Sequence, residues 1–312
     1  MKTKVTKKNI ILFLCLVLVC ALLIPKQIIN EDFNEHFNEH SNNDIMIWSK
    51  GPFINNYSNK DTDICSNKKD IIDIINHSTN IIWIRNGSTS NTLDLQLFAN
   101  NIDLLHKPVV LVTTDGDRSV PSSYNKDIVD KILNNKNITF WYTQNYDRSM
   151  IHPKLKHYPI GFDFHTKEWL INNNINKKQA FMIQTRKQNP THARISNKIF
   201  SDTHFVISHN ERTILYNTLK KNKDIVFSDK LKSFEEITKE YNKYNFVLSP
   251  RGNGLDCHRT WELFLAGNIV ITKTSPLDDM YVHNKLPVVI IKDWNELNIN
   301  LINKLKKWYI QY

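Results

Sequence analysis

The sequence predicts an α/β protein with two doubly wound domains that face a cleft. Continuous apolar runs alternate with segments of helical periodicity in two successive arrays, and a polar, asparagine-rich stretch at 168–179 separates them. Parallel strands covered on both faces have such continuous apolar runs. Ligands of parallel sheets bind beyond the carboxyl ends of the strands. We therefore expect the functional residues on the loops that follow the strands.

A basic segment and an apolar run precede these arrays. Residues 1–8 carry lysines and no acid, residues 10–24 are unbroken apolar sequence, and acidic residues follow. This charge order places the N-terminus in the cytosol and the body of the protein in the secretory lumen. A cleaved signal peptide is the alternative, but no small-residue cleavage site follows the run. We favour a cytosolic tail at 1–8, a signal-anchor helix at 9–29 and a stem at 30–44.

The remaining bulk features restrict the partners without identifying them. The formal net charge is +10, but lysines of the N-terminal segment contribute half of it, and no basic run is interleaved with aromatic residues. We therefore expect no nucleic-acid partner. His36 and His40 have the spacing of metal ligands on a helix, but we interpret their duplication, FNEHFNEH, as a slipped repeat in the stem. Cys65 and Cys257 can either pair or remain two free thiols.

The first array, residues 45–167, is expected to form the N-terminal domain. Its apolar runs predict strands at 80–85, 107–114, 138–145 and, more briefly, within 153–164. Apolar residues at helical spacing predict helices within 91–105 and 122–135. Arg85 ends the first of these strands, and we expect it near the loop that follows the second.

The second array, residues 180–312, is expected to form the C-terminal domain. Its predicted strands are 180–186, 224–229, 245–250, 268–272 and 286–294. Helices are expected at 211–222, at 233–244 and at the C-terminus. Ser233 and Glu236 predict a capping box at the start of the second of these helices. Asp256 and Gly267 predict the N-cap and the C-terminal stop of one further short helix.

That short helix and the loop before it concentrate charged and glycine residues, in the stretch SPRGNGLDCHRTWELFLAG. The residues expected to form a binding site are Arg251, Gly252, Asn253, Gly254, His258, Arg259 and Glu262. A helix N-terminus offers free N–H groups, and the two arginines beside it favour an anion, best a diphosphate. Glu262, nearly two turns into the helix, is placed to accept hydrogen bonds from a sugar or ribose hydroxyl.

A purely structural interpretation competes with this one. Arg259 and Glu262 can form an i,i+3 pair on a solvated helix face, and the glycines can simply make a turn. Either feature alone is ordinary. The gathering of two arginines, a histidine and a glutamate at one strand–helix corner favours the binding site.

The same residues resemble a known family. The stretch from 245 to 297, with HPKLKHYPIGFDFHT at 152–166, is similar to the C-terminal region of exostosin-like glycosyltransferases, in particular the ribitol xylosyltransferase branch and its viral and algal relatives. The resemblance implies two Rossmann-like domains of the GT-B type and a nucleotide-sugar donor held mainly by the C-terminal domain. It implies no obligatory metal, and it places donor-site residues at Arg251, Arg259 and Glu262.

Two further groups are candidates for the same cleft. Asp115 and Asp117 follow a strong strand and match the Asp-x-Asp pattern of metal-dependent transferases, but Asp and Gly also dominate turns. In a GT-B enzyme either carboxylate could deprotonate the acceptor hydroxyl, and Asp117 is the first choice. Arg186 and Arg194, expected after the first strand of the second domain, are candidate ligands of the donor phosphates. A solvated basic loop is the alternative, and it suits Lys187 better than the two arginines.

The sequence thus predicts a metal-independent glycosyltransferase that needs no cofactor. Its substrates are a nucleotide-sugar donor, expected to be a UDP-sugar, and a hydroxyl of a glycan or glycoprotein. We expect a single-pass type II protein of the Golgi or ER membrane, with the catalytic part in the lumen. The alternatives are a non-catalytic carbohydrate-binding protein on a degenerate transferase fold, and a metal-dependent transferase that uses Asp115 and Asp117.

Overall fold

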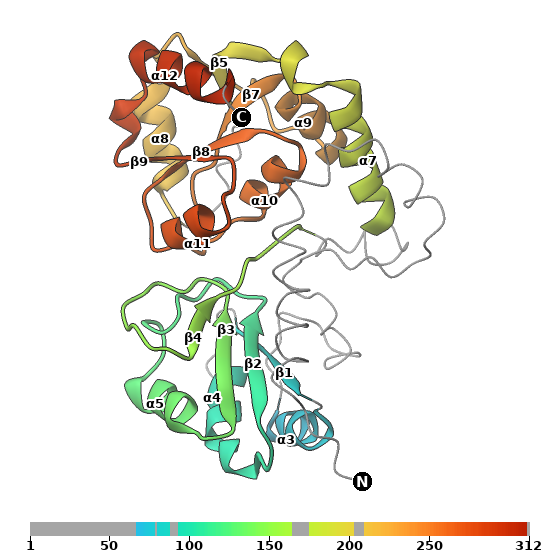
Figure 1. Cartoon of the computed structure of the whole chain (residues 1–312), viewed down its shortest axis with the longest axis vertical. Helices are drawn as coiled ribbons and strands as arrows, with labels where there is room; N and C mark the ends of the chain where they lie inside the picture. The colour runs from blue at the N-terminus through green and yellow to red at the C-terminus, as the bar shows by residue number, and fades with distance from the viewer. Residues whose placement is uncertain (1–66, 79, 88–92, 164–174, 203–208, 311–312) are drawn as a thin grey trace.

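The structure, a computed structural model of the chain, describes residues 67–78, 80–87, 93–163, 175–202 and 209–310. The expected tail, anchor and stem lie outside these residues, as do His36, His40 and Cys65. Within the described part, no helix combines the length and the apolar character that a membrane crossing requires. The chain folds as an α/β protein with two parallel sheets, one in each half of the sequence (Figure 1).

The N-terminal domain is built on a four-stranded parallel sheet with the order β1-β2-β3-β4. Its strands are β1 (Ile81–Arg85), β2 (Val109–Thr114), β3 (Ile138–Thr143) and β4 (Leu155–His157). Its helices are α3 (Lys68–His77), α4 (Asp94–Asn100), the 3-10 helix η3 (Ile102–Leu104) and α5 (Lys126–Asn134). All four predicted strands and both predicted helices of this half are confirmed.

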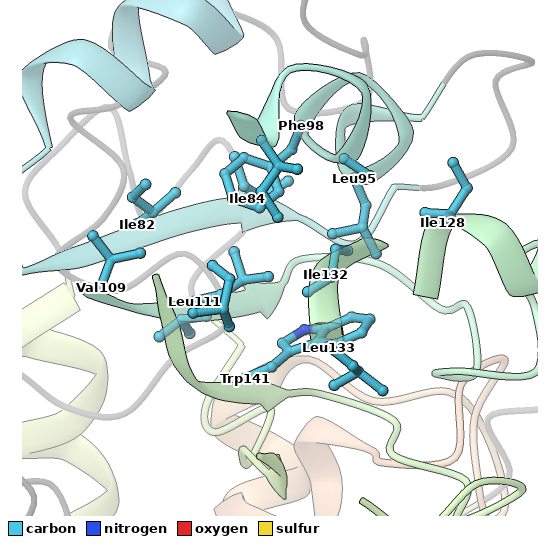
Figure 2. Packing of buried hydrophobic residues seen from close by; sticks show 14 of the residues in the cluster. Ile82, Ile84, Leu95, Phe98, Val109, Leu111, Ile128, Ile132, Leu133 and Trp141 are labelled. Atoms are coloured by element: carbon cyan, nitrogen blue, oxygen red, sulfur yellow. The ribbon is translucent and has the colours of Figure 1, made fainter. Parts of the chain in front are cut away.

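Two tryptophans anchor the core of this domain. Trp83 on β1 and Trp141 on β3 are almost wholly buried in this core. Figure 2 shows Trp141 among apolar side chains of the sheet and of α4 and α5. Their indole N–H groups donate to the hydroxyls of Thr114, at 2.6 Å, and Thr113, at 2.8 Å. A buried indole needs such an acceptor. These bonds tie three neighbouring strands together near their carboxyl ends, where the loops toward the second domain begin.

The C-terminal domain is built on a five-stranded parallel sheet with the order β6-β5-β7-β8-β9. Its strands are β5 (Ile195–Ser201), β6 (Ile225–Phe227), β7 (Tyr244–Leu248), β8 (Ile269–Lys273) and β9 (Val288–Ile291). Its helices are α7 (Ile175–Gln188), α8 (Glu211–Leu219), α9 (Phe234–Tyr241), α10 (His258–Leu265), α11 (Asp278–His283) and α12 (Ile299–Ile310), with the 3-10 helices η4 (Thr191–Ala193) and η5 (Trp294–Glu296).

The strand order decides where a ligand can bind. In the second sheet it reverses between β5 and β7, so the connections leave these strands in opposite directions and open a crevice at their carboxyl ends. This is a doubly wound sheet, as expected. The four described strands of the first sheet are also parallel, but they follow chain order without a reversal. The switch point therefore belongs to the C-terminal domain.

The predicted strand at 180–186 is wrong, because these residues lie inside α7. A short apolar run reads equally well as a strand or as part of a helix. The first strand of the second domain is β5, whose amino-terminal half is polar and partly exposed, so its sequence resembles a loop. The expected linker at 168–179 overlaps α7, which begins at Ile175.

The helix signals of the second domain agree closely with the structure. Ser233 and Glu236 form the predicted capping box of α9, with hydrogen bonds of 3.2 and 2.9 Å. Gly267 follows α10 with a φ of +77°, a left-handed conformation that suits glycine. The predicted N-cap is displaced by one residue, since Cys257 occupies that position and Asp256 precedes it.

Arg85 pairs with Thr114 at the end of β2, so it lies next to the loop that follows that strand, as expected. Its Nε and Nη2 both donate to Asp94 Oδ2 on α4, each at 3.1 Å, and the two side chains are 2% and 0% exposed. Breaking a buried ion pair leaves an uncompensated charge in a place that water cannot reach. This pair therefore holds α4 onto the end of β1.

Replacing Asp94 by alanine should lower the free energy of unfolding by about 3–5 kcal/mol, measured by urea denaturation. Asp130→Ala is the matched control, because it removes the carboxylate of an exposed pair with Lys126, and we expect it to change stability little. Equal effects of the two substitutions would contradict the assigned role of the Arg85–Asp94 pair.

Candidate functional site

A cavity of about 380 Å³ lies between the two domains, as the sequence predicted. The N-terminal domain contributes Asp117, the connection that follows β4 contributes Ile160 and Asp163, and the C-terminal domain contributes the rest. Part of the C-terminal contribution comes from the carboxyl ends of three neighbouring strands, with Asp202 after β5, Lys230–Lys232 after β6 and Gly252–Gly254 after β7, and the remainder comes mainly from helices α7 to α10. The cavity therefore sits over the switch point of the second sheet.

Arg259 is the buried cation of this cavity. It lies on the first turn of α10, is 8% exposed, and donates from Nη2 to Asp202 Oδ2 at 2.7 Å. Tyr241 donates its hydroxyl to the same oxygen at 2.8 Å. Burial lowers the pKa of Arg259, but the charge of Asp202, together with smaller contributions from Tyr241, Cys257 and Glu262, holds that pKa above its ordinary value. The guanidinium is therefore charged and fixed in place.

One edge of that guanidinium remains without a partner. Arg259 Nη1 is buried and makes no hydrogen bond among the residues that the structure describes. An unsatisfied charged donor in a buried position costs free energy of order 1–3 kcal/mol or more. Since Arg259 lines the cavity, an anionic ligand there would satisfy Nη1.

A second guanidinium lies close to the first. Arg212 on α8 is 6% exposed and donates from Nε to the carbonyl of Arg251 at 3.3 Å and from Nη2 to Cys257 Sγ at 3.5 Å. Burial and the charge of Arg259 both lower the pKa of Arg212. Two buried like charges repel each other, and an anion between them would relieve that repulsion.

The glycine-bearing loop between β7 and α10 lies at the boundary between the domains. Gly252, Asn253 and Gly254 line the cavity beside the N-terminus of α10. A Cβ on Gly254 would lie 2.8 Å from Asn145 Nδ2 of the other domain, so only glycine lets the two loops approach so closely. The loop thus brings the first turn of α10, with its outward N–H groups, to the boundary between the domains.

Glu262 and His258 share the cavity wall with Arg259. Glu262 accepts from Lys178 Nζ of α7 at 3.1 Å, and its side chain is 16% exposed. His258 Nδ1 lies 2.9 Å from the carbonyl oxygen of Gly161. The predicted common face of His258, Arg259 and Glu262 is therefore confirmed, although Glu262 pairs with Lys178 and not with Arg259.

Arg251 does not join Arg259 in this cavity. It lines a neighbouring cavity of about 210 Å³, and its Nη2 donates to the carbonyl of Asn253 at 3.0 Å. The two cavities meet at Cys257, which lines both. The second buried guanidinium of the larger cavity is that of Arg212 on α8, which sequence reasoning missed because its helix shows an unremarkable amphipathic pattern.

Arg186 and Arg194 are absent from the lining of the cavity, and their predicted location is wrong. Arg186 Nη1 donates to the carbonyl of Leu265 at 3.1 Å, and Arg194 Nη2 donates to the carbonyl of Ala266 at 2.9 Å. Both therefore bind the C-terminal end of α10. The physical reason is that residues 180–186 are helical and that Arg194 precedes β5, so it sits at the amino end of that strand.

Of the two acidic residues Asp115 and Asp117, one lines the cavity and the other does not. Asp117 is exposed and lines the cavity, whereas Asp115 has a φ of +62°, donates its backbone N–H to Gln144 Oε1 at 3.1 Å and is not among the lining residues. Only Asp117 therefore faces a molecule in the cavity. Within the described ranges, no group of three or more His, Cys, Asp or Glu side chains is arranged to hold a metal ion.

Asp256 joins the two domains at the base of the cavity. Its carboxylate is 3% exposed and accepts from the backbone N–H of Ile160 at 2.7 Å, from that of Cys257 at 2.9 Å and from Trp261 Nε1 at 2.9 Å. Burial raises the pKa of Asp256 to about 6, although these three donors oppose the shift.

The arrangement is that of a polyanion site with polar groups on either side. Two buried guanidiniums lie beside a helix N-terminus, a carboxylate held by a lysine stands one turn further along, and a second carboxylate faces them from the other domain. Neither a family model nor a curated protein matches the chain.

Asp256 predicts a specific pH dependence of stability. The folded state binds the proton of this carboxyl more tightly than the unfolded state, because its pKa rises from 3.8 to about 6. Its contribution to stability is therefore fully present below about pH 4 and is lost as the pH rises through 6. Two pKa units correspond to about 3 kcal/mol.

Urea denaturation of the wild type and of Asp256→Asn at several pH values between 4 and 7 measures this contribution. As the pH falls, the free energy of unfolding of the wild type should increase relative to that of Asp256→Asn. Parallel curves for the two proteins would show that Asp256 does not titrate in this range.

Proposed function

We propose that the chain is a glycosyltransferase of the GT-B type that binds a nucleotide-sugar donor in the interdomain cavity. The proposal rests on the buried guanidinium of Arg259, whose Nη1 makes no hydrogen bond to any described residue. Arg259 lies on the first turn of α10, beside the N-terminus of that helix. The cavity lies over the switch point of a doubly wound sheet, which is where such sheets bind nucleotides. The resemblance of residues 245–297 to exostosin-like enzymes supports the same assignment.

The leaving group of such a transfer is a nucleoside diphosphate. Negative charge develops on it as the bond to the sugar breaks. In our proposal the guanidiniums of Arg259 and Arg212 and the free N–H groups of α10 stabilise that charge. Because Asp202 already fixes Arg259, the guanidinium needs no reorganisation when the charge appears. Glu262, fixed by Lys178, accepts hydrogen bonds from a ribose or sugar hydroxyl.

The acceptor is approached from the N-terminal domain. Asp117 is the proposed general base, because it lines the cavity and is more exposed than Asp163, the other carboxylate that residues 45–167 present there. It would take the proton of the attacking hydroxyl as the new bond to the sugar forms. We propose a metal-independent reaction in which the arginines take the place of a cation, a UDP-sugar as the donor, and a glycan or glycoprotein as the acceptor at the Golgi or ER membrane.

Donor binding is tested by a thermal-shift screen of the protein against UDP-, GDP- and CMP-sugars, because a ligand that binds only the folded state raises the melting temperature. One class of donor should raise the melting temperature of the wild type. Arg259→Lys keeps a cation for Asp202 but loses the planar fork, so the donor Kd should rise at least about tenfold, by calorimetry.

Lys126→Ala, on the exposed face of α5, is the control and should bind as the wild type does. The proposal fails if no nucleotide sugar shifts the melting temperature, or if Arg259→Lys binds the donor unchanged. Binding of glycans without any nucleotide affinity would instead identify a carbohydrate-binding protein.

Catalysis is tested with Asp117→Asn. This variant should lower kcat by about 10²–10⁴-fold, because it removes the base, and should leave the donor Kd within about twofold. Turnover by the wild type should persist in EDTA. Loss of turnover in EDTA with recovery on adding Mn²⁺ would favour a metal held by Asp115 and Asp117 and would contradict the metal-independent mechanism.

A further inference from the structure

A continuous path of buried hydrogen bonds crosses the boundary between the domains. Gly116, next to Asp117, accepts at its carbonyl from Asn145 Nδ2 at 2.9 Å. The amide oxygen of Asn145 accepts from the backbone N–H of Asp256 at 2.8 Å. The carboxylate of Asp256 accepts from the N–H of Ile160, in the connection that leaves the first domain after β4 and packs in the core of the second.

We infer that Asn145 and Asp256 form an interdomain clamp, and that Asn145 is a positioning residue that sets Asp117 relative to Arg259. The second half of this inference rests on the proposed function. The clamp concerns the fold alone, so it can be tested without any substrate.

Asn145 is buried, and its neighbours restrict the position of its side chain. Its side chain is 1% exposed, and its backbone carbonyl accepts from Val120 N at 3.0 Å. Its φ of +56° lies in the left-handed region, which asparagine tolerates better than most residues. Gly254 packs directly on its amide, where a Cβ would come within 2.8 Å of Nδ2. The surroundings therefore leave the amide one orientation, with its donor toward Gly116 and its acceptor toward Asp256.

Both ends of the clamp lead directly to residues of the cavity. Asp117 follows Gly116 in the chain, and Gly116 also accepts from Gln144 Nε2 at 2.9 Å. On the other side, Asp256 Oδ1 holds the first turn of α10 through Cys257 N and Trp261 Nε1. Arg259 lies on that same turn. A displacement at Asn145 must therefore shift the acidic loop of one domain against the guanidinium of the other.

Asn145 does not line the cavity. The groups that we propose to hold the donor all belong to the C-terminal domain, and none of them bonds to the Asn145 side chain. Loosening the clamp should thus leave donor affinity nearly intact while it misplaces the base. Misplacing a reacting group by about 1 Å can cost roughly 10²-fold in rate.

Asn145→Gly is the variant of choice, because glycine adopts a positive φ without strain and the substitution removes only the amide. Lys285→Gly is the matched control: Lys285 has a φ of +52° and is exposed, in the turn after α11. For each variant, hydrogen–deuterium exchange at the N–H groups of Ile160 and Asp256 is measured beside kcat and the donor Kd.

We expect Asn145→Gly to speed exchange at Ile160 and Asp256 at least tenfold, to lower kcat about 10²-fold and to leave the donor Kd within about twofold. Lys285→Gly should match the wild type in all three measurements. Unchanged exchange in Asn145→Gly would overturn the clamp whether or not the protein is a transferase. Faster exchange with an unchanged kcat, or a Kd that worsens as much as kcat, would overturn the positioning role.

Discussion

The site depends on one ion pair, between Arg259 on α10 and Asp202 at the end of β5. A guanidinium that is 8% exposed has lost most of its hydration, and the carboxylate of Asp202 compensates for part of that loss. The two residues are far apart in sequence, and they meet because β5 and β7 are neighbours in the sheet. The reversal of strand order at this point sends the following connections apart and leaves room above the pair. The fold thus supplies a fixed cation with an unused donor, and the cavity around it follows from the same topology.

The second constraint is the contact between the domains. Asp256 is a buried carboxylate whose three hydrogen-bond donors are neutral N–H groups. These neutral donors stabilise the charged carboxylate only in part. The effect of burial is larger, and it raises the pKa of Asp256 to about 6. Two of these donors belong to the chain around α10, and the third, the N–H of Ile160, belongs to the connection that follows β4. The backbone N–H of Asp256 itself donates to Asn145 of the first domain. Asp256 therefore orders the helix N-terminus through its carboxylate and joins the domains through its N–H group.

The sequence predicted those features that local patterns determine. Continuous apolar runs located most strands, the Ser233–Glu236 pair located the start of α9, and Gly267 located the end of α10. The strand at 180–186 failed because a short apolar run has no distinctive period, and β5 was missed because its first residues are polar and partly exposed.

The site was predicted only in part, because its remaining members are brought together by tertiary contacts. His258, Arg259 and Glu262 share one helix, and their common face follows from helical spacing. Asp202 and Arg212 join them from β5 and α8, in sequence surroundings that show no motif. Once β5 is misplaced, Arg186 and Arg194 are assigned to the wrong end of the sheet.

A crystal structure of the protein with its nucleotide-sugar donor tests the central claim most directly. We expect a diphosphate oxygen of the donor at about 2.7–2.9 Å from Arg259 Nη1, with Asp202 still bound to Nη2. A donor bound outside the interdomain cavity, or one whose diphosphate leaves Nη1 without a partner, would contradict it.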